Sequence, residues 1–130
     1  MDRLGRTDLH YAAAENDFAK AQALIKSEFD VNAKDDNQWT ALHFAAQSDS
    51  LHVAKLLLEA GAEVDPTDSY GNTPLATAVF NYRGSGDLIA LLREKSADPY
   101  RENHHAQSPL GLARLIANYD VAKCFDDLPK

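Results

Sequence analysis

The sequence predicts an all-α protein in which four serial helix-turn-helix units stack into one elongated domain. One observation behind this prediction is an internal repeat with a period of 33 residues. A second is the three- and four-residue spacing of apolar residues within the repeat, which is typical of one face of a helix. A third is the polar, turn-forming stretch between successive units. A unit of this length cannot bury its apolar faces alone, so neighbouring units must stack.

The repeat is clearest in the segments that open the units. Residues 7–13 read TDLHYAA, and residues 40–46, which read TALHFAA, align with them without a gap after 33 residues. Residues 73–79, TPLATAV, follow after another 33 residues, and a weaker copy, SPLGLAR, begins 35 residues later at Ser108. We therefore expect a single domain over residues 1–130, with repeats at approximately 2–34, 35–67, 68–102 and 103–130.

Each unit is expected to contain two helices joined by a turn. The second apolar segment is clearest at Leu51, Ala54 and Leu57, where the spacing describes one helix face. Gly61 follows that segment, and a glycine there can adopt the left-handed conformation that ends a helix. The polar residues 68–72, DSYGN, then predict a tight, hairpin-like connection to the next unit.

These features resemble the ankyrin-repeat family, whose units open with Thr-Pro-Leu-His-x-Ala-Ala and leave with Gly-Ala-Asp-Val-Asn. The second unit carries the resemblance best, in residues 40–46, 56–58 and 61–65. The resemblance covers essentially the whole chain, and it implies an α-solenoid of four stacked units with hairpin-like connecting loops. Gln38 and Ala106 depart from the family pattern, because the equivalent positions elsewhere in this chain are the turn glycines Gly5 and Gly71.

Composition excludes some classes of partner. Thirteen basic against twenty acidic residues give a formal net charge of −7, which would repel a nucleic-acid backbone. No apolar run approaches the length of a membrane span or a secretory signal, and the single cysteine suits a reducing compartment. We therefore expect a cytoplasmic monomer that binds neither nucleic acid nor membrane, and that needs no cofactor.

The histidines and the cysteine favour structural roles. His10 and His43 recur at the same place of the repeat, three residues after a threonine that can cap a helix, so we expect them to join loop and helix. His104 and His105 are adjacent and have no further ligand at a recognisable zinc spacing, which favours a loop tip over a metal site. Cys124 is expected to pack on the apolar face of a last helix running from Tyr119 to Phe125.

The resemblance also implies where a partner would bind. In the ankyrin family, the concave surface is formed by the hairpin tips and the exposed side of each first helix. From these positions and the turn within the third unit we predict the following partner-binding residues: Arg6, Asp36, Trp39, Tyr70, Asn72, Phe80, Tyr82 and Arg83. The same matching places further residues on the concave surface, namely Arg3, Ala14, Glu15, Asn37, Gln47, Ser48, Ser69, Asn81, His104, His105 and Gln107.

Two alternatives to this site remain open in the sequence. Aromatic and arginine side chains are the types that most often anchor protein interfaces, but Trp39 and Tyr70 could instead pack against neighbouring hairpins. Tyr82 and Arg83 lie in the turn that carries the two extra residues of the third unit. That insertion is compatible with a second contact or with tolerated drift in a surface loop.

The function that follows is a non-enzymatic protein-protein interaction module, which binds another protein, possibly a basic one, through its concave groove. The acidic balance motivates an alternative, a stoichiometric inhibitor or immunity protein that neutralises a basic toxin or enzyme. A metal-dependent enzyme built around His104 and His105 is a second, weaker alternative, and a structural subunit of a larger complex is a third. No phosphate-binding loop, nucleophile elbow or paired catalytic carboxylates support an enzyme.

Overall fold

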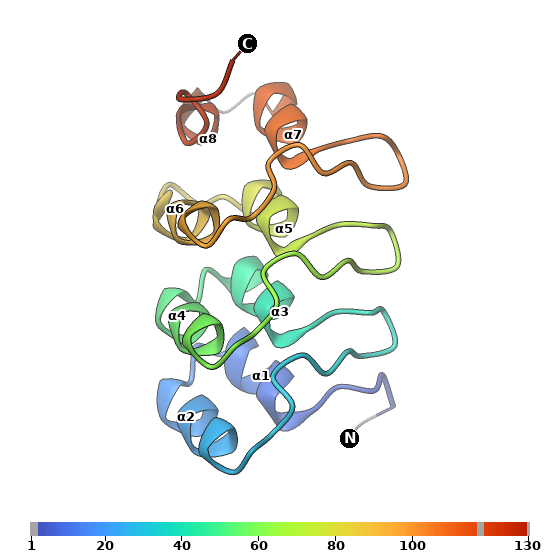
Figure 1. Cartoon of the computed structure of the whole chain (residues 1–130), viewed down its shortest axis with the longest axis vertical. Coiled ribbons are helices and arrows are strands. Elements are labelled where there is room, and N and C mark those ends of the chain that lie inside the picture. Colours follow the sequence, from blue (N-terminus) through green and yellow to red (C-terminus); the bar gives the residue numbers. More distant parts are fainter. Residues whose placement is uncertain (1–2, 117–118, 130) are drawn as a thin grey trace.

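The computed structural model describes residues 3–116 and 119–129, and within these ranges the regular secondary structure is entirely helical. Four helix pairs follow one another along the long axis of the molecule (Figure 1). The predicted all-α solenoid of four stacked units is thus confirmed. The helices are α1 (Asp8–Ala14), α2 (Phe18–Lys26), α3 (Ala41–Ser48), α4 (Leu51–Glu59), α5 (Pro74–Phe80), α6 (Asp87–Glu94), α7 (Pro109–Leu115) and α8 (Tyr119–Lys123).

The helices form two layers. The first helices of the units pack in series, α1 on α3, α3 on α5 and α5 on α7, while α2 packs on α4 and α4 on α6. The connecting hairpins project from the side of the first helices, away from the second layer (Figure 1). One edge of the stack therefore presents a row of hairpins beside a row of helices, which is the arrangement that makes a groove.

The core lies between the layers and recurs from unit to unit. One leucine in each first helix is buried at the equivalent position, namely Leu9, Leu42, Leu75 and Leu110. In the second layer, Leu57 of α4 is fully buried. The apolar spacing of the sequence therefore produces one continuous core rather than four separate ones.

Each first helix begins at a hydroxyl residue whose side chain accepts a hydrogen bond from the third backbone N–H of the helix. In the first two units the histidine returns the bond, since the backbone N–H of Thr7 donates to Nδ1 of His10 at 2.8 Å, and that of Thr40 to Nδ1 of His43 at 3.1 Å. Nδ1 accepts, so the ring proton is on Nε2. In His43 this nitrogen donates to the carbonyl of Asn72 at 2.9 Å. The predicted structural role of both histidines is confirmed.

The hairpins all contain a residue with left-handed backbone at the same place, with φ of 72° at Gly5, 63° at Gln38, 82° at Gly71 and 58° at Ala106. The two departures from the family pattern therefore keep the family's backbone geometry. At Gly71 a side chain is also excluded by space, because a Cβ would lie 2.9 Å from Cδ2 and 3.1 Å from the backbone nitrogen of His104. Gln38 and Ala106 hold the same turn under strain.

We expect Ala106→Gly to raise the free energy of unfolding by about 0.5–1 kcal/mol, because relief of left-handed strain exceeds the entropy that a glycine loses on folding. Urea denaturation followed by circular dichroism measures this change. Gly71→Ala is the matched control and should lower stability. A loss of stability in Ala106→Gly would show that this turn is not strained.

The fourth unit is tied to the third by one ion pair. The guanidinium of Arg93 in α6 donates to both carboxylate oxygens of Asp127, at 2.7 and 2.8 Å, and to the carbonyl of Cys124 at 2.8 Å. This bidentate pair holds the pKa of the Asp127 carboxyl below its usual value. The expected last helix was too long, since α8 ends at Lys123. Cys124 follows the helix and is only half-buried against the core.

Candidate partner-binding groove

Each hairpin is closed by one Asp or Asn side chain. Oδ1 of Asp35 accepts hydrogen bonds from the backbone N–H groups two and four residues later, both at 2.9 Å. Asp68 does the same at 2.9 Å, and Asn103 at 2.8 and 3.0 Å. The sequence analysis did not predict this role, although the signal is present, because these three residues recur with the repeat.

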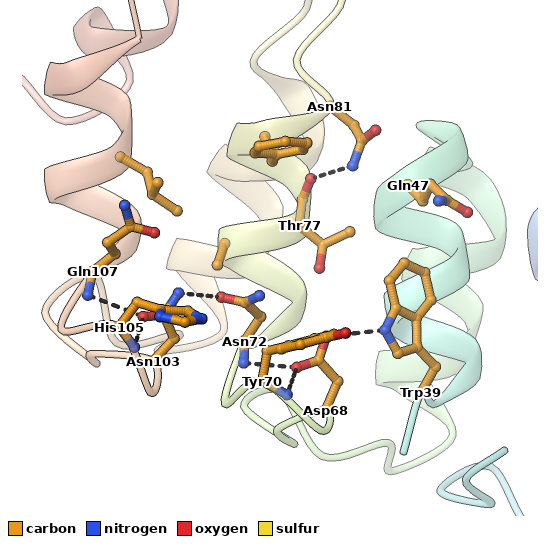
Figure 2. Close-up of a pocket in the computed structure, with 13 residues that line it drawn as sticks. Trp39, Gln47, Asp68, Tyr70, Asn72, Thr77, Asn81, Asn103, His105 and Gln107 are labelled. Atoms are coloured by element: carbon orange, nitrogen blue, oxygen red, sulfur yellow. Dashed lines mark hydrogen bonds between the residues drawn. The ribbon is translucent and has the colours of Figure 1, made fainter. Parts of the chain in front are cut away.

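The second polar atom of each closing side chain bonds to the preceding hairpin. Nε of Arg6 lies 3.8 Å from Oδ2 of Asp35, and Nε1 of Trp39 donates to Oδ2 of Asp68 at 3.0 Å. In the next interval, Nδ2 of Asn103 donates to Oδ1 of Asn72 at 2.8 Å. Figure 2 shows the last two of these contacts side by side. Arg6, Trp39 and Asn72 occupy equivalent positions in their units, so one set of side chains links the hairpins in series.

Trp39 is therefore more enclosed than the predicted interface anchor. Its indole is half-buried, stacks on the ring of His43 with centroids 5.4 Å apart, and meets the edge of Phe44 at 5.0 Å. These contacts, with the bond to Asp68, correspond to the packing alternative. Tyr70 differs, because 63% of its surface is exposed while its backbone closes the hairpin. Phe80 is 74% exposed.

Tyr70 and Phe80 lie in a hollow between the hairpins and the first helices of the second, third and fourth units. The hollow has a volume of about 320 Å³ and is called the C-terminal hollow below (Figure 2). Its lining combines aromatic, aliphatic and amide side chains: Trp39, Gln47, Asp68, Tyr70, Asn72, Ala76, Thr77, Phe80, Asn81, Asn103, His105, Gln107 and Leu112.

A second hollow, the N-terminal hollow, continues the groove toward the first unit. Its volume is about 360 Å³, and it is lined by Arg6, Asp35, Asn37, Trp39, Phe44, Gln47 and Tyr70. The two hollows share Trp39, Gln47 and Tyr70, so these side chains form the wall between them. The Arg6 guanidinium lies 5.5 Å above the ring of Phe44, and it brings charge to this end of the groove.

The structure brings five of the eight predicted residues to the groove. Arg6 and Trp39 line the N-terminal hollow, and Trp39, Asn72 and Phe80 line the C-terminal hollow, while Tyr70 belongs to both. The other three residues lie outside both hollows. Asp36 is exposed at a hairpin tip, where its backbone N–H donates to the carbonyl of Leu4 at 2.8 Å.

Tyr82 and Arg83 lie in the connection between α5 and α6, as the sequence predicted, but they do not join the groove. They line a separate crevice of about 10 Å³ with Ala46, Leu88 and other residues of the third and second units. Tyr82 is half-buried and packs against the core rather than standing on a protruding loop. This connection therefore adds packing to the third unit.

The sequence analysis missed the contribution of the fourth unit's first helix to the groove. Leu112 lines the C-terminal hollow, and Leu115 is 73% exposed. Both follow from the repeat, because they lie 35 residues after Thr77 and Phe80. The signal was available in the spacing, but the weak match of the fourth opening segment obscured it.

Burial lowers the pKa of His43 below its ordinary value of 6.5, while the hydrogen bond to the Asn72 carbonyl and the nearby Asp68 partly oppose this shift. Below pH 6.5 the unfolded chain binds a proton that the folded chain does not. We therefore expect stability to fall as the pH drops from 6.5 toward the folded pKa, by up to about 1.4 kcal/mol per pH unit. Denaturation midpoints at several pH values measure this slope, and His43→Gln should flatten it. An equal slope in both proteins would contradict the assignment.

Among the described residues, no three potential metal ligands of the His, Cys, Asp or Glu type come together. His104 and His105 lie at the tip of the fourth hairpin, where the backbone N–H of His104 donates to the carbonyl of Tyr70 at 2.9 Å. No helix in the described part of the chain has the length and apolarity needed to cross a bilayer.

A helical solenoid with a hairpin-lined groove is the class of protein that this architecture defines. The family model for ankyrin repeats matches residues 4–103 with three copies, and the chain belongs to the ankyrin-repeat family. Ankyrin repeats are in general protein-protein interaction modules. The fourth unit lies almost wholly outside the matched range, in keeping with its weaker opening segment.

Curated relatives share the repeats within longer proteins. Serine/threonine-protein kinase 12 of Arabidopsis thaliana is 37% identical over 119 residues, which are 90% of this chain and 24% of the kinase. The nuclear factor NF-kappa-B p105 subunit of Gallus gallus is 38% identical over 76% of this chain and 10% of its own length. A putative ankyrin repeat protein of Rickettsia bellii is 36% identical over 76% of this chain and 55% of its own length. The kinase match covers only repeat regions and indicates no enzymatic function for this chain.

Proposed function

We propose that this chain is a non-enzymatic recognition module that binds one protein partner through the groove between its hairpins and first helices. The observation that carries the proposal is the exposure of Tyr70 and Phe80 in a hollow of about 320 Å³. Large aromatic side chains that remain in water within a concave site are the groups that most often anchor a protein interface. The proposal treats the four repeats as a single domain that acts as a cytoplasmic monomer.

The hairpin contacts support the proposal because they hold the groove in place before a partner arrives. Trp39 bonds to Asp68, and Asn103 bonds to Asn72, so each hairpin is fixed to its neighbour. A preformed surface loses little conformational freedom on binding. Affinity can then come from a few anchors rather than from a large contact area.

The net charge of −7 favours a second candidate, a stoichiometric neutraliser of a basic toxin or enzyme. Asp35 and Asp68 contribute little to such a surface, because they are buried and engaged in hairpin bonds. The acidic contact would therefore have to involve exposed carboxylates such as Asp36. A steep loss of partner affinity between low and high salt would favour this candidate.

Affinity capture tests the proposal directly. The immobilised chain is exposed to native lysate of the organism that produces it, alongside the variant Tyr70→Ser/Phe80→Ser, and captured proteins are quantified by mass spectrometry. We expect at least one protein to be retained by the native chain and reduced at least about tenfold by the variant. Both side chains are mostly exposed, so the variant should keep its helical circular dichroism.

Phe18→Ser is the matched control, because Phe18 is an exposed aromatic residue of the second helical layer, away from the hollows. This variant should capture the same protein as the native chain. A captured protein that is insensitive to the groove variant would move the site elsewhere on the molecule. Capture of nothing by any of the three would contradict the recognition module itself.

A further inference from the structure

The two hollows of the groove differ in charge. The N-terminal hollow contains Arg6 and Asp35, whereas the C-terminal hollow is lined by no lysine, arginine or glutamate, and Asp68 is its only acid. Asp68 is buried, and its two oxygens accept three hydrogen bonds, from the backbone of Tyr70 and Asn72 and from the indole of Trp39. Its charge is therefore compensated within the hairpins. Apart from His105 at the hairpin tip, the C-terminal hollow offers a ligand only uncharged groups.

These uncharged groups are of two kinds. Tyr70, Phe80 and Leu112 supply apolar surface, and the amides of Gln47 and Gln107 supply hydrogen-bonding groups. Within the described part of the chain, these two amides make no hydrogen bond to protein. An amide carries both donors and acceptors, as a peptide group does. The lining is thus suited to an apolar side chain flanked by peptide groups.

The size and continuity of the groove set the kind of ligand. An apolar cavity of about 150 Å³ accommodates one benzene molecule. A hollow of about 320 Å³ therefore has room for one large side chain together with adjoining main chain. The groove continues past Trp39 and Tyr70 into the N-terminal hollow, so an elongated ligand can extend along it.

We propose that the C-terminal hollow binds an extended, uncharged segment of a protein partner, which inserts one leucine- or phenylalanine-sized side chain against Tyr70, Phe80 and Leu112. The amides of Gln47 and Gln107 bond to the main chain of that segment. A charged side chain is excluded, because its desolvation in this hollow has no opposite charge to offset it. The inference rests on the proposed function and narrows it, since the recognised segment is apolar rather than basic.

Selection from a phage-displayed library of random linear dodecapeptides tests the inference, with the full chain as bait at pH 8 and 150 mM salt. We expect enriched peptides to contain one large apolar residue with uncharged neighbours. A synthetic peptide of the enriched sequence should change the emission of Trp39, which lines both hollows. Its affinity should be independent of salt and should fall at least about tenfold in Tyr70→Ser/Phe80→Ser. Phe18→Ser should bind it within about twofold of the native chain.

Other outcomes overturn the inference in distinguishable ways. Enrichment of lysine- or arginine-rich peptides, with binding that weakens in salt and survives the double variant, would refute the apolar segment while leaving a protein-binding function in place. Enrichment of no peptide would likewise refute a linear segment. The lysate capture with the same variants then decides separately whether the groove recognises a folded protein.

Discussion

Replacing Leu57 with alanine is expected to lower the free energy of unfolding by about 2–5 kcal/mol. Leu57 is fully buried in α4, and this helix packs against both α2 and α6. The substitution removes apolar contacts and leaves a cavity that the adjoining helices fill only in part. Small domains have a total stability of about 5–15 kcal/mol, so this one change removes a large fraction of it. Urea denaturation monitored by circular dichroism gives the difference.

Lys55→Ala is the control for this prediction, because Lys55 lies on the exposed side of the same helix. It should change stability by less than about 0.5 kcal/mol. Similar losses in the two variants would mean that the effect of Leu57 comes from helix propensity rather than burial. Partner binding by Leu57→Ala should recover under conditions in which the variant is fully folded.

The second large effect is expected at Asp68. Asp68→Ala should lower the free energy of unfolding by about 2–4 kcal/mol, because it leaves the backbone N–H groups of Tyr70 and Asn72 and the indole N–H of Trp39 without their acceptors. Trp39 is the only tryptophan, so its emission should also shift as the indole loses this bond. Denaturation followed by fluorescence measures both changes on one sample.

Asp68→Asn separates the two functions of this carboxylate. Asn103 already closes the fourth hairpin in the same way, so an asparagine at position 68 should keep the two backbone bonds. It would present an NH₂ group to the indole N–H and lose that bond. We therefore expect the Asn variant to be intermediate in stability between the native chain and Asp68→Ala. An Asn variant as unstable as the Ala variant would show that the link to Trp39 dominates.

The sequence was sufficient for the fold because its repeat carries local and global information together. The threonine that opens a helix, the histidine that bonds back to it and the leucines of the core all recur with one period. The left-handed turn could also be predicted, since Gln38 and Ala106 align with glycines. Helix ends were less predictable, as α8 shows, because the fourth unit matches the pattern only weakly.

The groove was predictable in position but not in detail. Matching positions to the family placed Tyr70 and Phe80 correctly in a concave site. It did not reveal that Trp39 is engaged by Asp68, because that bond joins residues from two different units. It also placed Tyr82 and Arg83 among the binding residues, although the connection they occupy packs against the core. Such contacts depend on how one unit sits on the next.

The serial contacts between hairpins divide the groove into two classes of position for anyone redesigning its specificity. Exchanges at Arg6, Trp39 or Asn72 would alter recognition and cohesion together, because each of these side chains contacts the following unit. Exchanges at Gln47, Tyr70 or Phe80 would alter the ligand-facing surface alone. A library confined to the second class should retain the scaffold while sampling new partners.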